Sequence, residues 1–156
     1  MKQDVNKRDD VGANPLIWAS QNGHGQTVQI LLERGANILL EQGADVNAQG
    51  GEDGNALQAA CARGHDKIAQ ILLERGADVN AQGGFYGNAL QAACARGYDK
   101  IAQILLERGA DVNAQGGEYS NALQAACAGG HDKIAQILLE QGADVNAQGG
   151  EDGNAL

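Results

Sequence analysis

Short groups of apolar residues with helical spacing recur along this chain at a fixed interval of 33 residues. Two markers repeat at the same interval, an Asn that opens the sequence Asn-Ala-Leu and a Gly that follows it: Asn55, Asn88, Asn121 and Asn154, with Gly64, Gly97 and Gly130. A period of this length predicts a solenoid, in which each unit packs only against its neighbours. We therefore expect a stack of units rather than a single globular core.

The first part of each unit predicts a short helix. In residues 52–84, Asn55 can accept hydrogen bonds from the free amides that begin a helix, and the residues after it are good helix formers. Gly64 can adopt the left-handed conformation that ends a helix. The sequence therefore predicts a first helix from Ala56 to Arg63.

A second helix is expected from Lys67 to Arg75, with Asp66 as its N-cap. Its apolar residues keep to one face, and Gly76 follows its last turn. The remainder, residues 77–87, is polar, rich in glycine and too short for a third helix. It predicts an extended, hairpin-like loop that projects between units.

Four segments of this unit resemble the ankyrin repeat. They lie where that family has its glycine-histidine pair, its leucine run, its Gly-Ala-Asp-Val-Asn-Ala segment and its Thr-Pro-Leu-His-x-Ala-Ala segment: Gly64-His65, Ile71-Leu-Leu-Glu, Gly76-Ala-Asp-Val-Asn-Ala and Asn55-Ala-Leu-Gln-Ala-Ala-Cys. In the last of these, Asn replaces Thr and Gln replaces His. The resemblance covers residues 14–156, and it implies an all-α solenoid of stacked helix-turn-helix units with projecting hairpin loops.

The repeats divide the chain into six segments. We expect a polar N-terminal tail (1–13), an irregular first unit (14–51), three regular units (52–84, 85–117 and 118–150) and the truncated start of a further unit (151–156). The last full unit has no polar capping unit after it. We therefore expect the apolar face around Ile134, Ile137 and Leu138 to fray or to be covered by another molecule, including a second copy of the chain.

The first unit contains an eight-residue slip in register. The sequence Ile-Leu-Leu-Glu occurs at Ile30 and again at Ile38, and only the second copy is in register with Ile71. Apolar residues recur at helical spacing across the slip, which predicts one long helix from Gln26 to Gln42.

This long helix would run through Gly35. A glycine there costs about 1 kcal/mol relative to alanine, which is less than the packing of the apolar stripe recovers. The extra length would displace the first helix, residues 15–22, so that it does not stack level with residues 56–63.

Charge and hydropathy exclude several classes of partner. The net charge of -9 and the pI near 4.6 argue against nucleic acid, which is bound largely by Lys and Arg. No apolar run approaches the roughly 18 residues of a membrane helix. The first ten residues contain no apolar signal segment. We therefore expect an intracellular, cytoplasmic protein that binds neither nucleic acid nor membrane.

The cysteines and histidines predict no metal site, cofactor or catalytic centre. Helices pack about 8 to 10 Å apart, whereas a disulfide needs Cα atoms within about 7 Å, so Cys61, Cys94 and Cys127 are expected to be small core residues. Each unit offers one Cys and at most one His, too few for a zinc site. The three histidines are expected to complete the turns between helices: His24, His65 and His131.

The three regular units differ at only a few positions, none of them on an apolar helix face. They are Glu52 (Phe85, Glu118), Asp53 (Tyr86, Tyr119), Gly54 (Gly87, Ser120), Arg63 (Arg96, Gly129), His65 (Tyr98, His131) and Arg75 (Arg108, Gln141). Every aromatic residue except Trp18 falls at one of them. Surface aromatics are expected at binding hot spots, although drift at tolerant positions would give the same list.

In the ankyrin family, loop tips and the outer ends of the first helices line a concave groove that binds other proteins. The resemblance therefore implies a partner site at Glu52, Asp53, Arg63, Phe85, Tyr86, Arg96, Tyr98, Glu118 and Tyr119. The rings of Phe85, Tyr86 and Tyr119 should form a strip, flanked by Tyr98. A protein or peptide with basic residues around an apolar anchor would fit it.

Two other functions remain open beside a non-catalytic interaction module. The near-identical units are similar to the ankyrin arrays of fungal nucleotide-switch immunity proteins, which implies the sensor fragment of a larger protein. Alternatively, the chain is a passive scaffold or an engineered consensus array without a natural ligand. An enzyme is expected only if residues distant in sequence assemble a site.

Overall fold

The part of the chain that the computed structural model describes, residues 4–33 and 43–148, contains eight short α-helices and no β-strand. The helices are α1 (Pro15–Gln21), α2 (Gly25–Leu32), α3 (Ala56–Arg63), α4 (Asp66–Glu74), α5 (Ala89–Arg96), α6 (Asp99–Glu107), α7 (Ala122–Ala128) and α8 (Asp132–Glu140). The helix expected over residues 56–63 is confirmed as α3.

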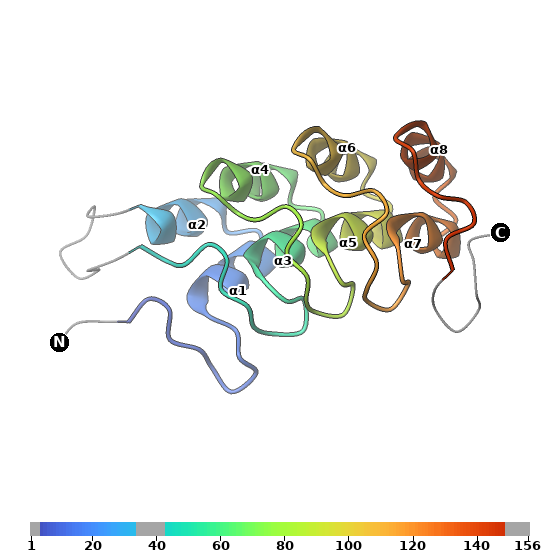
Figure 1. Cartoon of the computed structure of the whole chain (residues 1–156). Coiled ribbons are helices and arrows are strands. Elements are labelled where there is room, and N and C mark those ends of the chain that lie inside the picture. The colour runs from blue at the N-terminus through green and yellow to red at the C-terminus, as the bar shows by residue number, and fades with distance from the viewer. Residues whose placement is uncertain (1–3, 34–42, 149–156) are drawn as a thin grey trace.

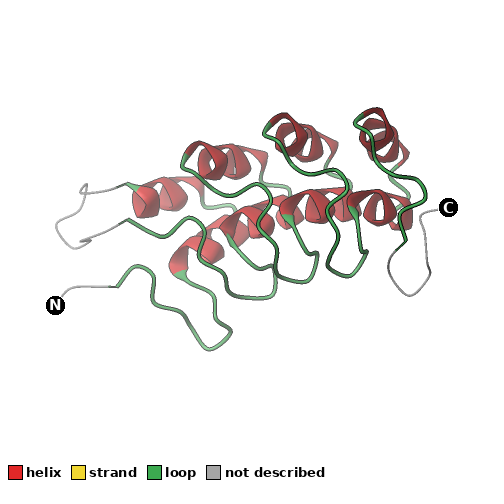
Figure 2. Cartoon of the chain, in the orientation of Figure 1, coloured by secondary structure: helices red, strands yellow, loops and turns green. Residues whose placement is uncertain are grey.

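The helices form two rows (Figures 1 and 2). The first helices of the units, α1, α3, α5 and α7, pack successively against one another, and α2, α4, α6 and α8 form the second row. The loops between units project from the first row, away from the second (Figure 2). The expected all-α solenoid of stacked helical units is therefore confirmed.

Asparagine caps begin the helices of the first row. Their side-chain oxygens accept a hydrogen bond from the backbone N–H three residues later: Asn14, Asn55, Asn88 and Asn121. Gly64 and Gly97 end α3 and α5 with φ of 81° and 80°, a left-handed conformation that favours glycine. Local sequence is therefore sufficient to set both ends of these two helices.

The second-row helices begin differently from the prediction. The N-cap role expected for Asp66 is wrong, because Asp66 is the first residue of α4 and the N-cap is His65. Asp66 instead pairs with Lys100 of the next unit, and Asp99 pairs in the same way with Lys133. The hydrogen bond from each lysine lowers the pKa of its aspartate partner. These pairs connect α4 to α6 and α6 to α8.

The core follows the two rows from unit to unit. Leucines of the second row are completely buried, at Leu72, Leu105 and Leu138. Small residues of the first row are buried as well, including Ala59, Ala60, Ala92, Ala93, Ala125 and Ala126. Small side chains allow neighbouring helices to approach closely, so the units stack without gaps.

A row of asparagine side chains joins each loop to the next. Asn80 Oδ1 accepts from the backbone N–H of Asp111 at 2.8 Å, and Asn80 Nδ2 donates to the carbonyl of Gly109 at 3.1 Å. Asn47 and Asn113 make the same two bonds with the units that follow them. Each asparagine therefore satisfies backbone groups of the neighbouring unit rather than its own.

Residues 4–13, expected as a polar tail, make contacts like those of a loop between units. Asn6 Oδ1 accepts from the backbone N–H of Asp45 at 2.8 Å, the contact that Asn47 makes with the next unit. Val5 and Ala13 are buried. The indole Nε1–H of Trp18 donates to Asp9 Oδ2 at 2.6 Å, which attaches this segment to α1.

The single long helix expected from Gln26 to Gln42 is wrong. α2 ends at Leu32, and Glu33 has an extended backbone with ψ of 118°. Short helices depend on packing for stability, and a longer α2 would run beyond the end of α4, against which it packs. Residues 34–42, which include Gly35, lie outside the described residues.

A backbone hydrogen bond shows which copy of the repeated sequence forms the helix. The carbonyl of Leu31 accepts from the N–H of Ala44 at 2.6 Å, as the carbonyl of Leu72 accepts from Ala77 at 2.9 Å. The first copy, at Ile30, therefore takes the place of the regular second helix. The regular register resumes at the loop after it.

The expectation that α1 does not stack level with α3 is also wrong. α1 packs against α3 as α3 packs against α5. His65 Nε2 lies 3.1 Å from the carbonyl of Gln21, and His131 Nε2 lies 3.1 Å from the equivalent carbonyl of Ala95. The extra residues follow α2 and precede the next loop, so they do not displace the helices.

The C-terminal unit does not expose the face that we expected. Ile134 and Leu138 are buried, and Ile137 is half-buried, because α8 packs against both α6 and α7. The exposed residues of this unit are instead Cys127 and Leu139, whose counterparts in the preceding unit are covered by the next helices. The expected apolar face is therefore wrong for Ile134 and Leu138.

Candidate functional site

Three loops of similar conformation project from the first row of helices. We call them finger 1 (residues 45–54), finger 2 (78–87) and finger 3 (111–120). In finger 2, the Gly83 N–H donates to the carbonyl of Gly87 at 2.8 Å, and in finger 3 the Gly116 N–H donates to that of Ser120 at 2.8 Å. Each bond turns the chain back on itself, so every finger presents a tip of two or three residues.

Backbone hydrogen bonds join the three tips into one row. The N–H of Phe85 donates to the carbonyl of Glu52 at 2.9 Å, and the N–H of Glu118 donates to the carbonyl of Phe85 at 3.1 Å. These are the first positions at which the repeats differ. The variable side chains of successive units therefore lie on neighbouring points of a continuous surface.

Two glycines that we did not single out from the sequence allow the tips to approach. A Cβ at Gly84 would lie 2.4 Å from the carbonyl of Asp53, and a Cβ at Gly117 would lie 2.2 Å from that of Tyr86. Any side chain would therefore push neighbouring fingers apart. The Gly-Gly pair in each loop is the signal that could have identified them.

Finger 2 holds the only ring-to-ring contact among the described residues. The rings of Phe85 and Tyr86 lie 5.0 Å apart at an interplanar angle of 88°, an edge-to-face arrangement. Tyr86 is half-buried and packs against the core, whereas Phe85 is 46% exposed. Tyr119 is half-buried in finger 3. The structure therefore brings Phe85 and Tyr86 together and leaves Phe85 as the most exposed ring at the tips.

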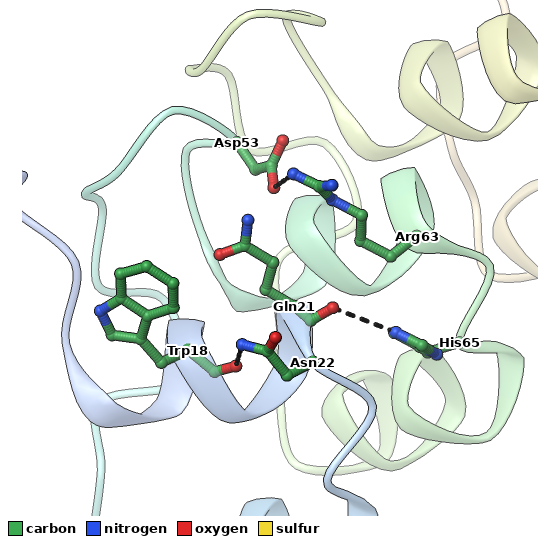
Figure 3. A network of polar contacts seen from close by, with 6 residues as sticks. All are labelled: Trp18, Gln21, Asn22, Asp53, Arg63 and His65. Atoms are coloured by element: carbon green, nitrogen blue, oxygen red, sulfur yellow. Dashed lines mark hydrogen bonds and ion pairs between the residues drawn. The ribbon is translucent and has the colours of Figure 1, made fainter.

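The acidic residues at the tips differ in exposure. Glu52 and Glu118 are exposed, but Asp53 is only 6% exposed, and its Oδ2 lies 3.5 Å from Nη2 of Arg63 (Figure 3). Burial raises the pKa of the Asp53 carboxyl, and the charges of Arg63 and Arg96 act against this rise. Asp53 is therefore an internal partner of Arg63, whereas the two glutamates face solvent.

The arginines of the first-row helices are also in different environments. Arg63, at the end of α3, extends to Asp53 of its own unit. Arg96 occupies the equivalent position on α5 and is exposed, and in the described part of the chain its side chain makes no hydrogen bond or ion pair. The third unit has Gly129 at this position. Only Arg96 therefore presents free guanidinium donors.

Tyr98 lies between units rather than on the finger surface. A Cβ on Gly64 would lie 2.8 Å from the Tyr98 ring, and a Cβ on Gly97 would lie 2.5 Å from the ring of His131. The ring at this position therefore packs on a glycine of the preceding unit. Because a carbonyl oxygen only accepts, Nε2 of His131 donates to Ala95 of that unit. The expected role of the histidines within their own turns is wrong for His65 and His131, which bridge units.

The cysteines are free thiols. Cys61 and Cys94 are buried, as expected for small core residues, and burial raises the pKa of Cys94 to about 12. Cys127 is exposed, so the expectation is wrong for this residue. In the ranges described, no group of His, Cys, Asp and Glu side chains could hold a metal ion. No helix that the structure describes has the length and apolar character to cross a membrane.

The buried carboxyl of Asp53 predicts a specific pH dependence of stability. Its folded-state pKa is raised, so the folded state retains this proton at a pH where the unfolded state has lost it. The parent chain therefore loses this contribution to stability as pH rises through the range above the model value of 3.8. We expect Asp53→Asn, which carries no such proton, to gain stability relative to the parent between acid and neutral pH in urea unfolding.

Asp99→Asn is the matched control for this prediction. Lys133 lowers the pKa of Asp99, so the carboxylate of the parent stabilises the fold above the unfolded-state pKa and loses this effect as pH falls. This variant should therefore lose stability relative to the parent as pH rises. The assignment of Asp53 is contradicted if the two variants follow the same trend with pH.

Two models of known families match the sequence. A model that describes three copies of the ankyrin repeat matches residues 35–116 and 84–149, and a model of one ankyrin repeat matches residues 11–40. Together these matches extend over most of the residues. A comparison with curated proteins gives no match.

Proposed function

Because the chain belongs to the ankyrin repeat family, whose repeats are generally protein-protein interaction modules, we propose that it binds a protein partner through its finger tips. The surface consists of the three tips and the neighbouring ends of α3 and α5. Proteins of this family are typically binding modules without enzymatic activity. We further propose that the partner is recognised as a peptide segment and that the chain acts as the sensor part of a larger protein.

The exposed aromatic pair of finger 2 carries this proposal. Phe85 is 46% exposed although it is the one phenylalanine of the sequence, and Tyr86 holds it edge-to-face at 5.0 Å. A ring supported in this way loses little conformational freedom on binding, which favours a hot spot. A passive scaffold has no need for an aromatic side chain at this position.

The charges around the pair indicate the chemistry of the partner. The exposed carboxylates of Glu52 and Glu118 flank Phe85 on the two adjacent tips, to which it is joined by backbone hydrogen bonds. An apolar anchor on Phe85 with basic residues on either side would match this surface. Such binding should weaken as salt concentration rises, because exposed charges are screened.

The test compares a tip variant with a matched surface variant. The intact chain is used as bait for a random-sequence peptide library, and the recovered peptides are titrated against the Phe85→Ala, Tyr86→Ala double variant. We expect a loss of about 2 kcal/mol or more, roughly 30-fold in Kd, as for a hot spot. Leu139→Ala removes an exposed apolar side chain of α8, away from the fingers, and should bind as the parent does.

Folding is checked separately by circular dichroism and urea unfolding. Tyr86 packs against the core, so the double variant is expected to lose some stability but to remain folded at the assay temperature. Equal affinity of the parent and the double variant for every recovered peptide would show that the partner binds elsewhere. The same conclusion holds if the library gives no binding peptide.

A further inference from the structure

We propose, on the basis of the proposed function, that Arg96 binds a carboxylate of the partner beside the Phe85–Tyr86 pair. The carboxylate is an Asp or Glu side chain, or the C-terminus, of the peptide segment anchored on finger 2. This assigns the register in which the partner lies along the fingers. It also distinguishes Arg96 from every other cation of the first-row helices.

The chain contains an occupied example of this contact one unit earlier. In the unit before Arg96, the carboxylate of Asp53 lies 3.5 Å from the guanidinium of Arg63 and is almost completely buried (Figure 3). An arginine at this position of the repeat can therefore hold a carboxylate against the base of the finger. Guanidinium and carboxylate groups form strong, charge-assisted hydrogen bonds in such settings.

The next unit keeps the arginine but lacks the acid. Tyr86 stands where Asp53 stands in the preceding unit, and Arg96 stands where Arg63 stands. Arg96 is exposed, and no ion pair or hydrogen bond of its side chain is found among the described residues. Its guanidinium donors are thus available to a ligand, whereas those of Arg63 already face an internal acid.

The position of Arg96 is fixed by two further observations. Its charge lowers the pKa of Asp53 in finger 1, so its side chain extends toward the groove between fingers 1 and 2. The equivalent reach of Arg63, from α3 to finger 1, places the guanidinium of Arg96 close to Tyr86. An anchor on the Phe85–Tyr86 pair would therefore have this cation beside it.

The third unit limits the contact to one place. Gly129 replaces the arginine there, and Tyr119 replaces the acid, so neither partner of the ion pair is present. The charges along the surface are therefore ordered, with exposed acids at the tips and one free arginine nearer the helices. The matching segment has basic residues toward the tips and one acidic group toward α5.

The experiment uses peptides recovered from a random-sequence library with the intact chain as bait. We expect them to carry an Asp or Glu, or a free C-terminus, at a constant distance from an aromatic or large apolar residue. Arg96→Ala should weaken their binding about tenfold or more, the usual cost of losing a charge-assisted hydrogen bond. Arg63→Ala is the matched control and should change Kd much less, because Arg63 is paired within the chain.

A charge reversal makes the result specific. A second selection with Arg96→Glu as bait should recover peptides with Lys or Arg at the position where the first selection gave an acid. A change in packing alone would not exchange the charge of the selected residue. Arg96 is exposed, so both Arg96 variants should unfold at the same urea concentration as the parent.

The outcomes separate this inference from the proposed function. If Arg96→Ala binds as the parent does while Phe85→Ala with Tyr86→Ala does not, the carboxylate contact is overturned and the tip surface stands. If neither variant affects binding, or if no peptide is recovered, both proposals are overturned. Loss of binding in Arg96→Ala together with the charge exchange in the second selection supports the inference.

Discussion

Replacement of Leu105 by Ala should lower the free energy of unfolding by about 3 kcal/mol, within the range of 2–5 kcal/mol for buried leucines. Leu105 lies on α6, is completely buried, and has its counterparts at Leu72 and Leu138 in the adjacent second-row helices. Its truncation leaves a cavity that the neighbouring units cannot close without shifting the stack. Urea unfolding followed by circular dichroism measures the loss.

Leu139→Ala is the control for the core prediction. Leu139 belongs to the same type of helix as Leu105 but is 46% exposed. Its truncation removes few buried contacts, so we expect a change below about 1 kcal/mol. Similar losses for the two variants would contradict the arrangement of the second row.

Replacement of Gly117 by Ala should cost about 3 kcal/mol or more, because the overpacking of a close backbone contact adds to the cost of a left-handed conformation. Gly117 has φ of 69°, and a Cβ there would lie 2.2 Å from the carbonyl of Tyr86. Backbone atoms cannot rotate away, so fingers 2 and 3 would have to separate. Thermal and urea unfolding should both show the loss.

Gly109→Ala isolates the conformational part of this cost. Gly109 has φ of 87° but no atom within 4 Å of the position of a Cβ. Only the left-handed backbone opposes the substitution, so we expect a loss of about 1 kcal/mol. If Gly117→Ala is no more destabilising than Gly109→Ala, the close contact between the fingers is not present in solution.

Sequence alone was enough to predict the class of fold and the ends of the first-row helices. The interval of 33 residues indicates stacked units, and Asn55 and Gly64 define where α3 begins and ends. Both signals are local, because a cap acts on amides within one turn and a left-handed glycine acts at its own position. The same reasoning placed Leu72 and its counterparts on a buried face.

The candidate site could be predicted only in part. The differences between copies indicated finger-tip positions, and the structure places Phe85 and Tyr86 in contact there. Asp53 was indistinguishable in sequence from an exposed acid, because its burial depends on Arg63, which is ten residues away in sequence. Whether these residues bind a partner stays a prediction until the experiments above are done.

The sequence by itself determined which segments are helical and how they repeat, but tertiary structure decided where one helix stops and which side chains are buried. The apolar stripe around Ile30 predicted a long helix, yet α2 ends at Leu32 because its packing surface on α4 ends there. Similarly, Cys94 is buried and Cys127 is exposed although their local sequences are nearly identical. Periodicity and capping act over a few residues, whereas burial depends on the unit that stacks on each face.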